Sequence, residues 1–185
     1  MLTRKAIVEV ERVENAHHKL IHSTSACRDQ EPDAWKEWEE STSAWHAQRY
    51  QTDRLWEDGF LADLRGSVRH AIDDAILYLE VDPWYFRSGY LKERLIRGLK
   101  AAELTEGDRK RLRNVIWKVA GGRNRREYRD YCSLAAVVGD PGLVQRLEGV
   151  SPEQDHEAKG KFGYLLRYLR QNSKLCAQGA WGLEA

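Results

Sequence analysis

Apolar side chains recur three or four positions apart along most of this 185-residue chain, and this spacing is the feature that most constrains its fold. Residues at such intervals share one face of an α-helix, whereas a half-buried strand would alternate apolar and polar residues. The clearest stripe consists of Leu112, Val115, Ile116 and Val119. Only four prolines interrupt the chain, fewer than a fold of many short strands would normally carry. The sequence therefore predicts an all-α fold.

Capping and turn residues predict where the helices begin and end. Thr105 and Asp108 have the spacing of a capping box, and Asp140-Pro141 resembles an N-cap followed by a first-turn proline. The long segment 53–80 predicts one helix, kinked near its glycines, and 23–33 predicts a loop. We expect seven or eight helices, over about 7–21, 34–45, 53–80, 91–103, 106–120 and 124–138, then from 141 and from 152 to 171.

The predicted helices between 84 and 171 are short, and turns of two to four residues join them. Such turns force neighbouring helices to run nearly antiparallel. In helix length and turn chemistry this part resembles the helix pairs of HEAT-like repeat proteins, which implies a short array of antiparallel pairs. Because no fixed sequence period is visible, an irregular helical bundle is the alternative. We expect a single domain over 1–171 and a loosely attached tail over 172–185.

The charges are segregated along the chain. Residues 1–80 contain 10 Lys and Arg against 16 Asp and Glu, while residues 81–130 contain 14 against 7. The part from 131 to 171 is close to neutral, and the whole chain has a formal net charge of +1. A basic middle can attract polyanions, or it can pack against the acidic first part.

An aromatic segment follows Asp82-Pro83 and supplies the first candidate site. Trp84, Tyr85, Phe86, Arg87 and Tyr90 belong to the residue types that dominate protein–protein hot spots. These rings can instead fill the core. We hypothesise that the chain is a non-catalytic interaction module, such as an adaptor, a complex subunit or an inhibitor of the immunity type, whose partner is another protein.

A basic cluster over 106–130 supplies the alternative, which is sequence-independent binding of DNA or RNA. Two consecutive helices joined by Gly121-Gly122 could present its cations to phosphates as one surface. The competing interpretation is that these cations form a solvated basic face, or that they pair with the acidic first part. The candidate residues are Arg109, Lys110, Arg113, Lys118, Arg123, Arg125, Arg126 and Arg129.

A metal-dependent enzyme is the third hypothesis. Glu14, His18 and His22 lie four residues apart, and Glu14 and His17 have the spacing of one half of a di-iron motif. The chain lacks the further glutamates that such a site needs in the required order, so polar helix surface is the competing interpretation. No hydrolase, nucleotide-binding or zinc-protease motif occurs, and we expect neither an enzyme nor a cofactor.

The cysteines and the hydropathy bear on location. Cys27, Cys132 and Cys176 are far apart and odd in number, which argues against a disulfide framework and predicts a reducing, cytoplasmic environment. Cys132 is expected to be an inert core thiol. No window reaches about 18 uninterrupted apolar residues, so no membrane partner is expected.

Overall fold

The computed structural model describes residues 1–27, 34–150 and 156–172, and over these ranges it contains nine α-helices, one short 3-10 helix and no strand. The all-α prediction is confirmed, with nine helices in place of seven or eight. The helices are α1 (Arg4–Cys27), α2 (Ala34–Ala47), η1 (Asp53–Trp56), α3 (Asp58–Arg65), α4 (Arg69–Val81), α5 (Ser88–Ala101), α6 (Glu106–Ala120), α7 (Tyr128–Val138), α8 (Pro141–Glu148) and α9 (His156–Asn172).

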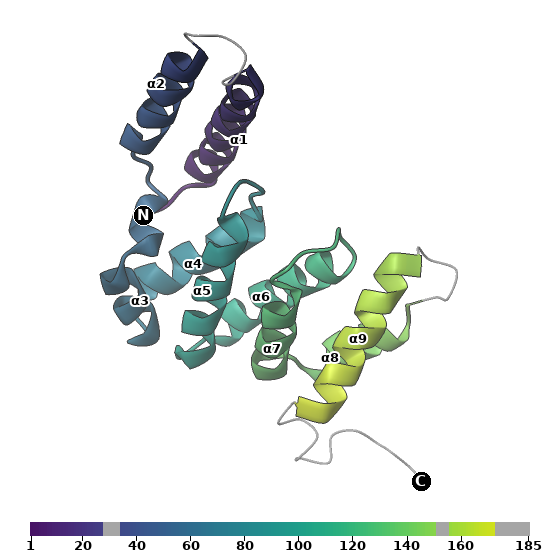
Figure 1. Cartoon of the computed structure of the whole chain (residues 1–185). Helices are drawn as coiled ribbons and strands as arrows, with labels where there is room; N and C mark the ends of the chain where they lie inside the picture. The colour runs from purple at the N-terminus through teal and green to yellow at the C-terminus, as the bar shows by residue number, and fades with distance from the viewer. Residues whose placement is uncertain (28–33, 151–155, 173–185) are drawn as a thin grey trace.

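Consecutive helices form hairpins that stack side by side into an elongated array (Figure 1). The hairpins α4–α5, α6–α7 and α8–α9 follow one another, with α5, α7 and α9 as neighbours in one layer and α4 beside α6 in the other. The α1–α2 hairpin adjoins this array through α1 and α4. Helix pairing of this kind places the loops within successive hairpins on one edge of the molecule (Figure 1).

The apolar stripes face a shared core, as their spacing predicts. On α6, Leu112 and Ile116 are buried against neighbouring helices. The capping box of this helix is complete, because the Thr105 hydroxyl accepts from the Asp108 N–H at 3.2 Å and the Asp108 carboxylate accepts from the Thr105 N–H at 3.0 Å. Asp140 caps α8 by accepting from the Leu143 N–H at 2.7 Å. Local sequence rules therefore position these helices correctly.

The segment 53–80 is not one kinked helix. It divides into η1, α3 and α4, and the main break lies at 66–68, where Ser67 adopts a left-handed backbone with φ of 66°. Gly59 lies inside α3 without breaking it. Shortening the helices lets α3 pack against both α4 and α5, so tertiary contacts override the helical periodicity here.

Other boundaries differ from the sequence-based ones. Residues 23–27 continue α1, where a loop was predicted, and the turn predicted at Ser151-Pro152 lies outside the described residues. Helix α7 begins at Tyr128, so residues 123–127 form a loop. The basic residues of that loop are therefore not displayed on a helix.

Part of the acidic first half does pair with the basic middle. The Arg111 guanidinium of α6 donates to the Glu80 carboxylate of α4 at 2.8 Å, and its Nη1 lies 3.6 Å from Asp73. In the opposite sense, Arg69 of α4 donates to Asp108 of α6 at 2.7 Å. Ion pairs of both senses thus join α4 to α6. Within the described residues, no helix combines the length and apolar character needed to cross a membrane.

Candidate interface of aromatic rings and arginines

The fold brings together two sets of residues that the sequence analysis treated as separate sites. The α4–α5 loop (82–87) and the α6–α7 loop (121–127) lie on the same edge of the array (Figure 1). The Arg123 guanidinium lies 3.7 Å from the centroid of the Trp84 ring, and that of Arg126 lies 3.7 Å from the Tyr90 ring. We call this surface the aromatic–arginine surface, and it consists of Trp84, Phe86, Arg87, Tyr90, Arg123 and Arg126.

The rings of the aromatic segment divide into outward and inward ones. Trp84, Phe86 and Tyr90 are 40%, 51% and 49% exposed. Tyr85 is largely covered, and its hydroxyl lies 2.8 Å from the hydroxyl of the fully buried Tyr78. Burial raises the pKa of Tyr85 to about 12. The segment therefore buries one ring, Tyr85, and exposes three to solvent. Clusters of exposed apolar rings are typical of interaction sites.

A buried set of four charged side chains fixes the two loops to each other. We call it the charge network, formed by Asp82, Lys92, Arg125 and Glu127. The Asp82 carboxylate accepts from Lys92 Nζ at 2.6 Å and from Arg125 Nη1 at 2.7 Å. Glu127 Oε1 lies 3.7 Å from Lys92 Nζ, and both of these side chains are almost completely buried. With two cations and two carboxylates, the network is close to neutral.

The environment shifts the pKa values of Lys92 and Asp82 in the charge network. Desolvation lowers the pKa of Lys92, although the Asp82 carboxylate opposes that effect. Burial alone would raise the pKa of Asp82, but the hydrogen bonds from Arg125 and Lys92 lower it. Asp82 therefore stays charged at neutral pH and holds two loops through one carboxylate.

The backbone of the α4–α5 loop is strained and held on both sides. Asp82 and Arg87 are left-handed, with φ of 57° and 68°. A non-glycine residue in this region costs about 1–3 kcal/mol and persists only where its surroundings enforce it. Helix α1 supplies part of that enforcement, because Glu11 accepts from the Trp84 N–H at 2.8 Å and Asn15 donates to the Trp84 carbonyl at 2.8 Å. The loop is thus a rigid support for its outward rings.

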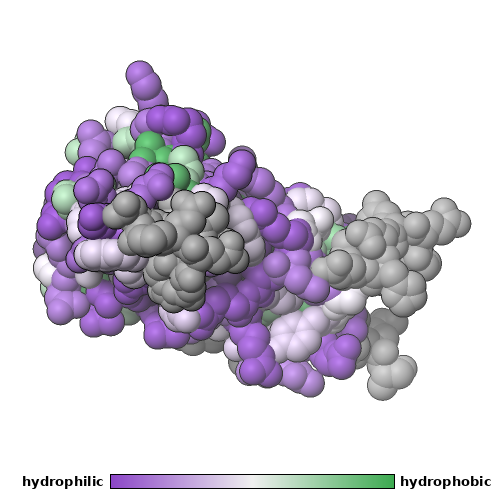
Figure 2. All heavy atoms as spheres, turned by 45° about the horizontal axis from the view of Figure 1, so that its top comes forward, coloured by the Kyte–Doolittle hydropathy of each residue, from purple (hydrophilic) through white to green (hydrophobic). Residues whose placement is uncertain are grey.

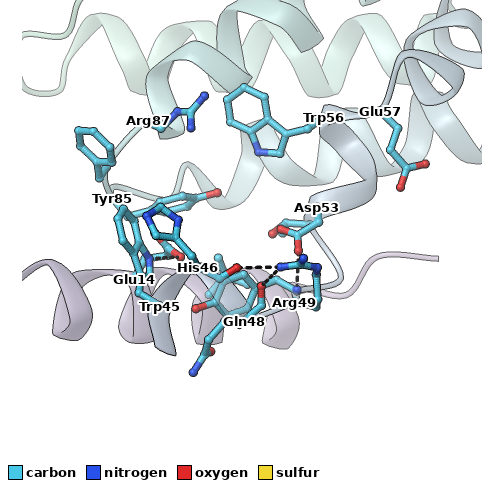
Figure 3. A pocket seen from close by; sticks show the side chains of 14 residues that line it. Glu14, Trp45, His46, Gln48, Arg49, Asp53, Trp56, Glu57, Tyr85 and Arg87 are labelled. Carbon is cyan, nitrogen blue, oxygen red and sulfur yellow. Dashed lines mark hydrogen bonds between the residues drawn. The ribbon is translucent and has the colours of Figure 1, made fainter. Parts of the chain in front are cut away.

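A hollow of about 600 Å³ adjoins the aromatic–arginine surface between α1, the end of α2, η1 and the α4–α5 loop (Figure 3). Its floor contains the buried Glu14, whose carboxylate accepts from Trp45 Nε1 at 3.1 Å. Burial, followed by the nearby Glu14 carboxylate, raises the pKa of Tyr50 to about 12. At its rim, Arg87 and Trp56 point toward each other, with 5.4 Å between guanidinium and ring.

The eight cations of the basic cluster do not form one surface. Arg125 belongs to the charge network, and Arg113 pairs with Glu106 and, at 2.9 Å, with Asp140. Three others interact with other groups. Arg109 donates to the Val137 carbonyl, Arg126 pairs with Glu93, and interaction with the Tyr164 hydroxyl raises the pKa of Arg129. Arg123 covers Trp84. Lys110 and Lys118 remain exposed on α6 and form no ion pair with the described residues.

The residues of the metal hypothesis are spread along α1. His18 and His22 approach with 3.1 Å between their Nε2 atoms, and His18 also stacks on Phe86 at 5.6 Å. Glu14 is directed instead to Trp45, and His17 Nε2 lies 3.5 Å from Gln48. Within the part of the chain that the structure describes, no three His, Cys, Asp or Glu side chains gather as a metal site.

Sequence reasoning missed several residues of this region. Nothing in the pattern around Lys92 distinguishes a fully buried lysine from its exposed neighbours, and Glu127 is equally hidden among charged residues. Trp56 was predicted only as part of the helix over 53–80, although its ring lies 5.4 Å from the Arg87 guanidinium and 6.0 Å from that of Arg94. The Asp82-Pro83 pair could have predicted the turn that ends α4. Asp tolerates a left-handed backbone, and the residue before a proline resists helical geometry.

One face of the molecule can be followed in Figure 2. On the face shown in Figure 2, hydrophilic residues predominate, and the hydrophobic ones gather in a small patch. No family model, no curated protein and no solved structure matches this chain.

Proposed function

We propose that this protein is a non-catalytic interaction module that binds another protein through the aromatic–arginine surface. The observation that carries the proposal is the display of three exposed rings on a strained loop held by the buried charge network. Strained backbone, buried charges and exposed rings each reduce stability, and all three coincide at one edge of the array. Departures from stability rules tend to concentrate at functional sites.

The chemistry of this surface suits a protein partner. Tryptophan, tyrosine and arginine are the residues enriched at interface hot spots. Each of the three rings exposes about half of its surface to solvent and packs the rest against the protein. Holding a side chain in place before binding lowers the entropy cost of association. Arg123 over Trp84 and Arg126 over Tyr90 are positioned in this way.

Site-specific crosslinking in cells tests the proposal. A benzophenone amino acid replaces Phe86 or Tyr90, and a control places it at Trp35, which is 48% exposed on α2. We expect a discrete protein adduct from positions 86 and 90 that the control does not give. The captured protein is then purified and titrated with this chain.

The titration uses a variant in which Trp84, Phe86 and Tyr90 are all alanine. Loss of a hot spot costs at least about 2 kcal/mol, so affinity should fall about 30-fold or more while the melting temperature is kept. Trp35→Ala, the matched control, should leave affinity unchanged. Unfolding of the triple variant would show that the rings are structural, and unchanged affinity would show that they do not contact the partner; either result would overturn the proposal.

Nucleic-acid binding is a second candidate because one part of the basic cluster stays available. Lys110, Asn114 and Lys118 are exposed at four-residue intervals on α6, and Arg146 of α8 lines a hollow beside Lys110. Such a stripe can contact phosphates without reading bases. It predicts salt-sensitive retention on immobilised duplex DNA that Lys110→Glu with Lys118→Glu abolishes. Absence of retention at low salt would reject it.

A further inference from the structure

A groove between α3 and α5 continues from the aromatic–arginine surface. It consists of two adjoining hollows of about 580 and 340 Å³, which share Arg94 and Arg97 in their linings. The first hollow includes Phe86, Arg87 and Tyr90, so groove and surface are continuous. We call it the α3–α5 groove, and the residues that matter below are Trp56, Leu61, Arg65, Arg87, Arg94 and Arg97.

Arginines run along the groove in a line. Arg87, Arg94 and Arg97 are seven and three residues apart, which puts them on one face of α5 and its N-cap. Ten residues of helix rise about 15 Å. Because an extended peptide advances about 3.3 Å per residue, the line matches a segment of about five residues.

These guanidinium groups retain unused donors. Arg97 is 61% exposed, and its nearest carboxylates, Glu93 and Asp130, lie 3.6 and 3.7 Å away, beyond good hydrogen-bond distance. Arg94 donates through Nη2 to the Trp56 carbonyl at 3.0 Å and to the exposed Asp58 carboxylate at 3.2 Å, while its buried Nε has no partner among the described residues. The groove therefore has donors to spare.

The charge of the groove is positive. Four arginines line it against two carboxylates, Asp58 and Glu93. Glu93 is already occupied, since Arg126 Nε lies 3.0 Å from its Oε1. Arg65 and Arg87 form no ion pair within the described residues. A partner segment placed here would have to supply negative charge.

The rings distinguish an acidic peptide from a single-stranded nucleic acid. Nucleic-acid bases bind such grooves by stacking on open aromatic faces. Here guanidinium groups already lie over the rings, with Arg87 and Arg94 5.4 and 6.0 Å from Trp56 and Arg126 3.7 Å from Tyr90. A guanidinium stacked on a ring keeps its N–H edge free for a carboxylate. The observations thus favour carboxylates over bases.

We propose that the α3–α5 groove binds an extended acidic peptide segment of a partner protein. The proposal rests on the proposed function and adds the chemistry of the ligand. Carboxylates of the segment would pair with Arg94 and Arg97, while Leu61 and Trp56 contact its backbone and apolar parts. The neighbouring rings of the aromatic–arginine surface would contact the rest of the partner.

Fluorescence anisotropy with defined probes tests this at low salt. The probes are a labelled decapeptide of alternating glutamate and serine, the same peptide with glutamine in place of glutamate, and a ten-nucleotide thymidine oligomer. We expect binding of the acidic peptide only, weakened about tenfold by Arg65→Glu with Arg97→Glu, because each reversed ion pair costs roughly half to one kcal/mol. Both arginines are exposed, so the variant should stay folded, with only a small loss of melting temperature from placing a carboxylate near Glu93 and Asp130.

The matched control, Lys118→Glu with Arg167→Glu, makes the same charge change on exposed residues outside the groove. It should leave peptide affinity close to wild type. Equal weakening by both variants, binding of the neutral peptide, tighter binding of the oligomer, or no binding of the acidic peptide would each overturn the proposal. If crosslinking through Phe86 then still captures a partner, the proposed function stands without this ligand.

Discussion

Replacing Asp82 by asparagine tests how strongly the charge network holds the loops. Asparagine has the same shape as aspartate and also tolerates a left-handed backbone. A loss of stability in this variant therefore reports the lost charge and not backbone strain. It leaves Lys92 and Arg125 facing only Glu127, a net buried positive charge. Removing one partner of a buried ion pair costs about 3–5 kcal/mol. Because Asp82 is 10% exposed, we expect the lower end, about 3 kcal/mol.

For a chain of this size, about 3 kcal/mol lowers the melting temperature by about 6–12 °C. Urea unfolding followed by circular dichroism at pH 7 measures the change. Asp58→Asn is the matched control, since Asp58 also pairs with an arginine, at 3.2 Å, but is fully exposed. We expect no measurable effect of that control.

The pH dependence gives a second reading of the same variant. The pKa of Asp82 is lowered in the folded state, so its stabilisation is present above its unfolded pKa of about 3.9 and is lost as pH falls through the folded pKa. The difference between wild type and Asp82→Asn should therefore narrow as the medium is acidified below about pH 4. Equal stability at pH 7, or a difference independent of pH, would refute this account of the loops.

Three further predictions concern the helical core. Hydrogen bonds from Arg69 and then Thr105 lower the pKa of Asp108 to about 2 from 3.8, so stability should fall between pH 4 and 2, and urea titration of Asp108→Asn should show a flatter profile there. Burial raises the pKa of Cys132 to about 12, so a thiol reagent should modify its peptide, detected by mass spectrometry, only after denaturation. Labelling in the native protein at the denatured rate would contradict this. Ile116→Ala should cost about 2–5 kcal/mol in urea unfolding, and a loss below about 1 kcal/mol would contradict its placement in the core.

The sequence predicted most of the fold because helix stripes and helix caps depend on residues close together in the chain. The stripe on α6 and the caps at Thr105 and Asp140 depend on residues within one helical turn, and the structure confirms them. Gly66 predicted a kink at this point, but the full break at Ser67 was not predicted, because a left-handed serine has no local signature. It is held by the packing of α3 on α4 and α5, which are contacts made across the fold.

The candidate site was only partly predictable for the same reason. Aromatic composition marked 84–90, but whether a ring points inward depends on what lies beneath it, as Tyr78 does beneath Tyr85. Likewise Arg123 and Arg125 are two residues apart, yet one covers Trp84 and the other is buried with Asp82. Long-range pairing decides such roles, and a single sequence does not contain it.

Hydroxyl-radical footprinting of the native protein tests the central claim most directly, that one segment holds an inward anchor and outward rings. Each oxidation rate is divided by the rate of the same residue in the unfolded protein, which removes differences in intrinsic reactivity. Trp84, Phe86 and Tyr90 are half-exposed, so they should oxidise at a substantial fraction of their unfolded rates, while Tyr85 and Tyr78 should be strongly protected. Protection of Trp84 and Phe86 as strong as that of Tyr78 would contradict the account.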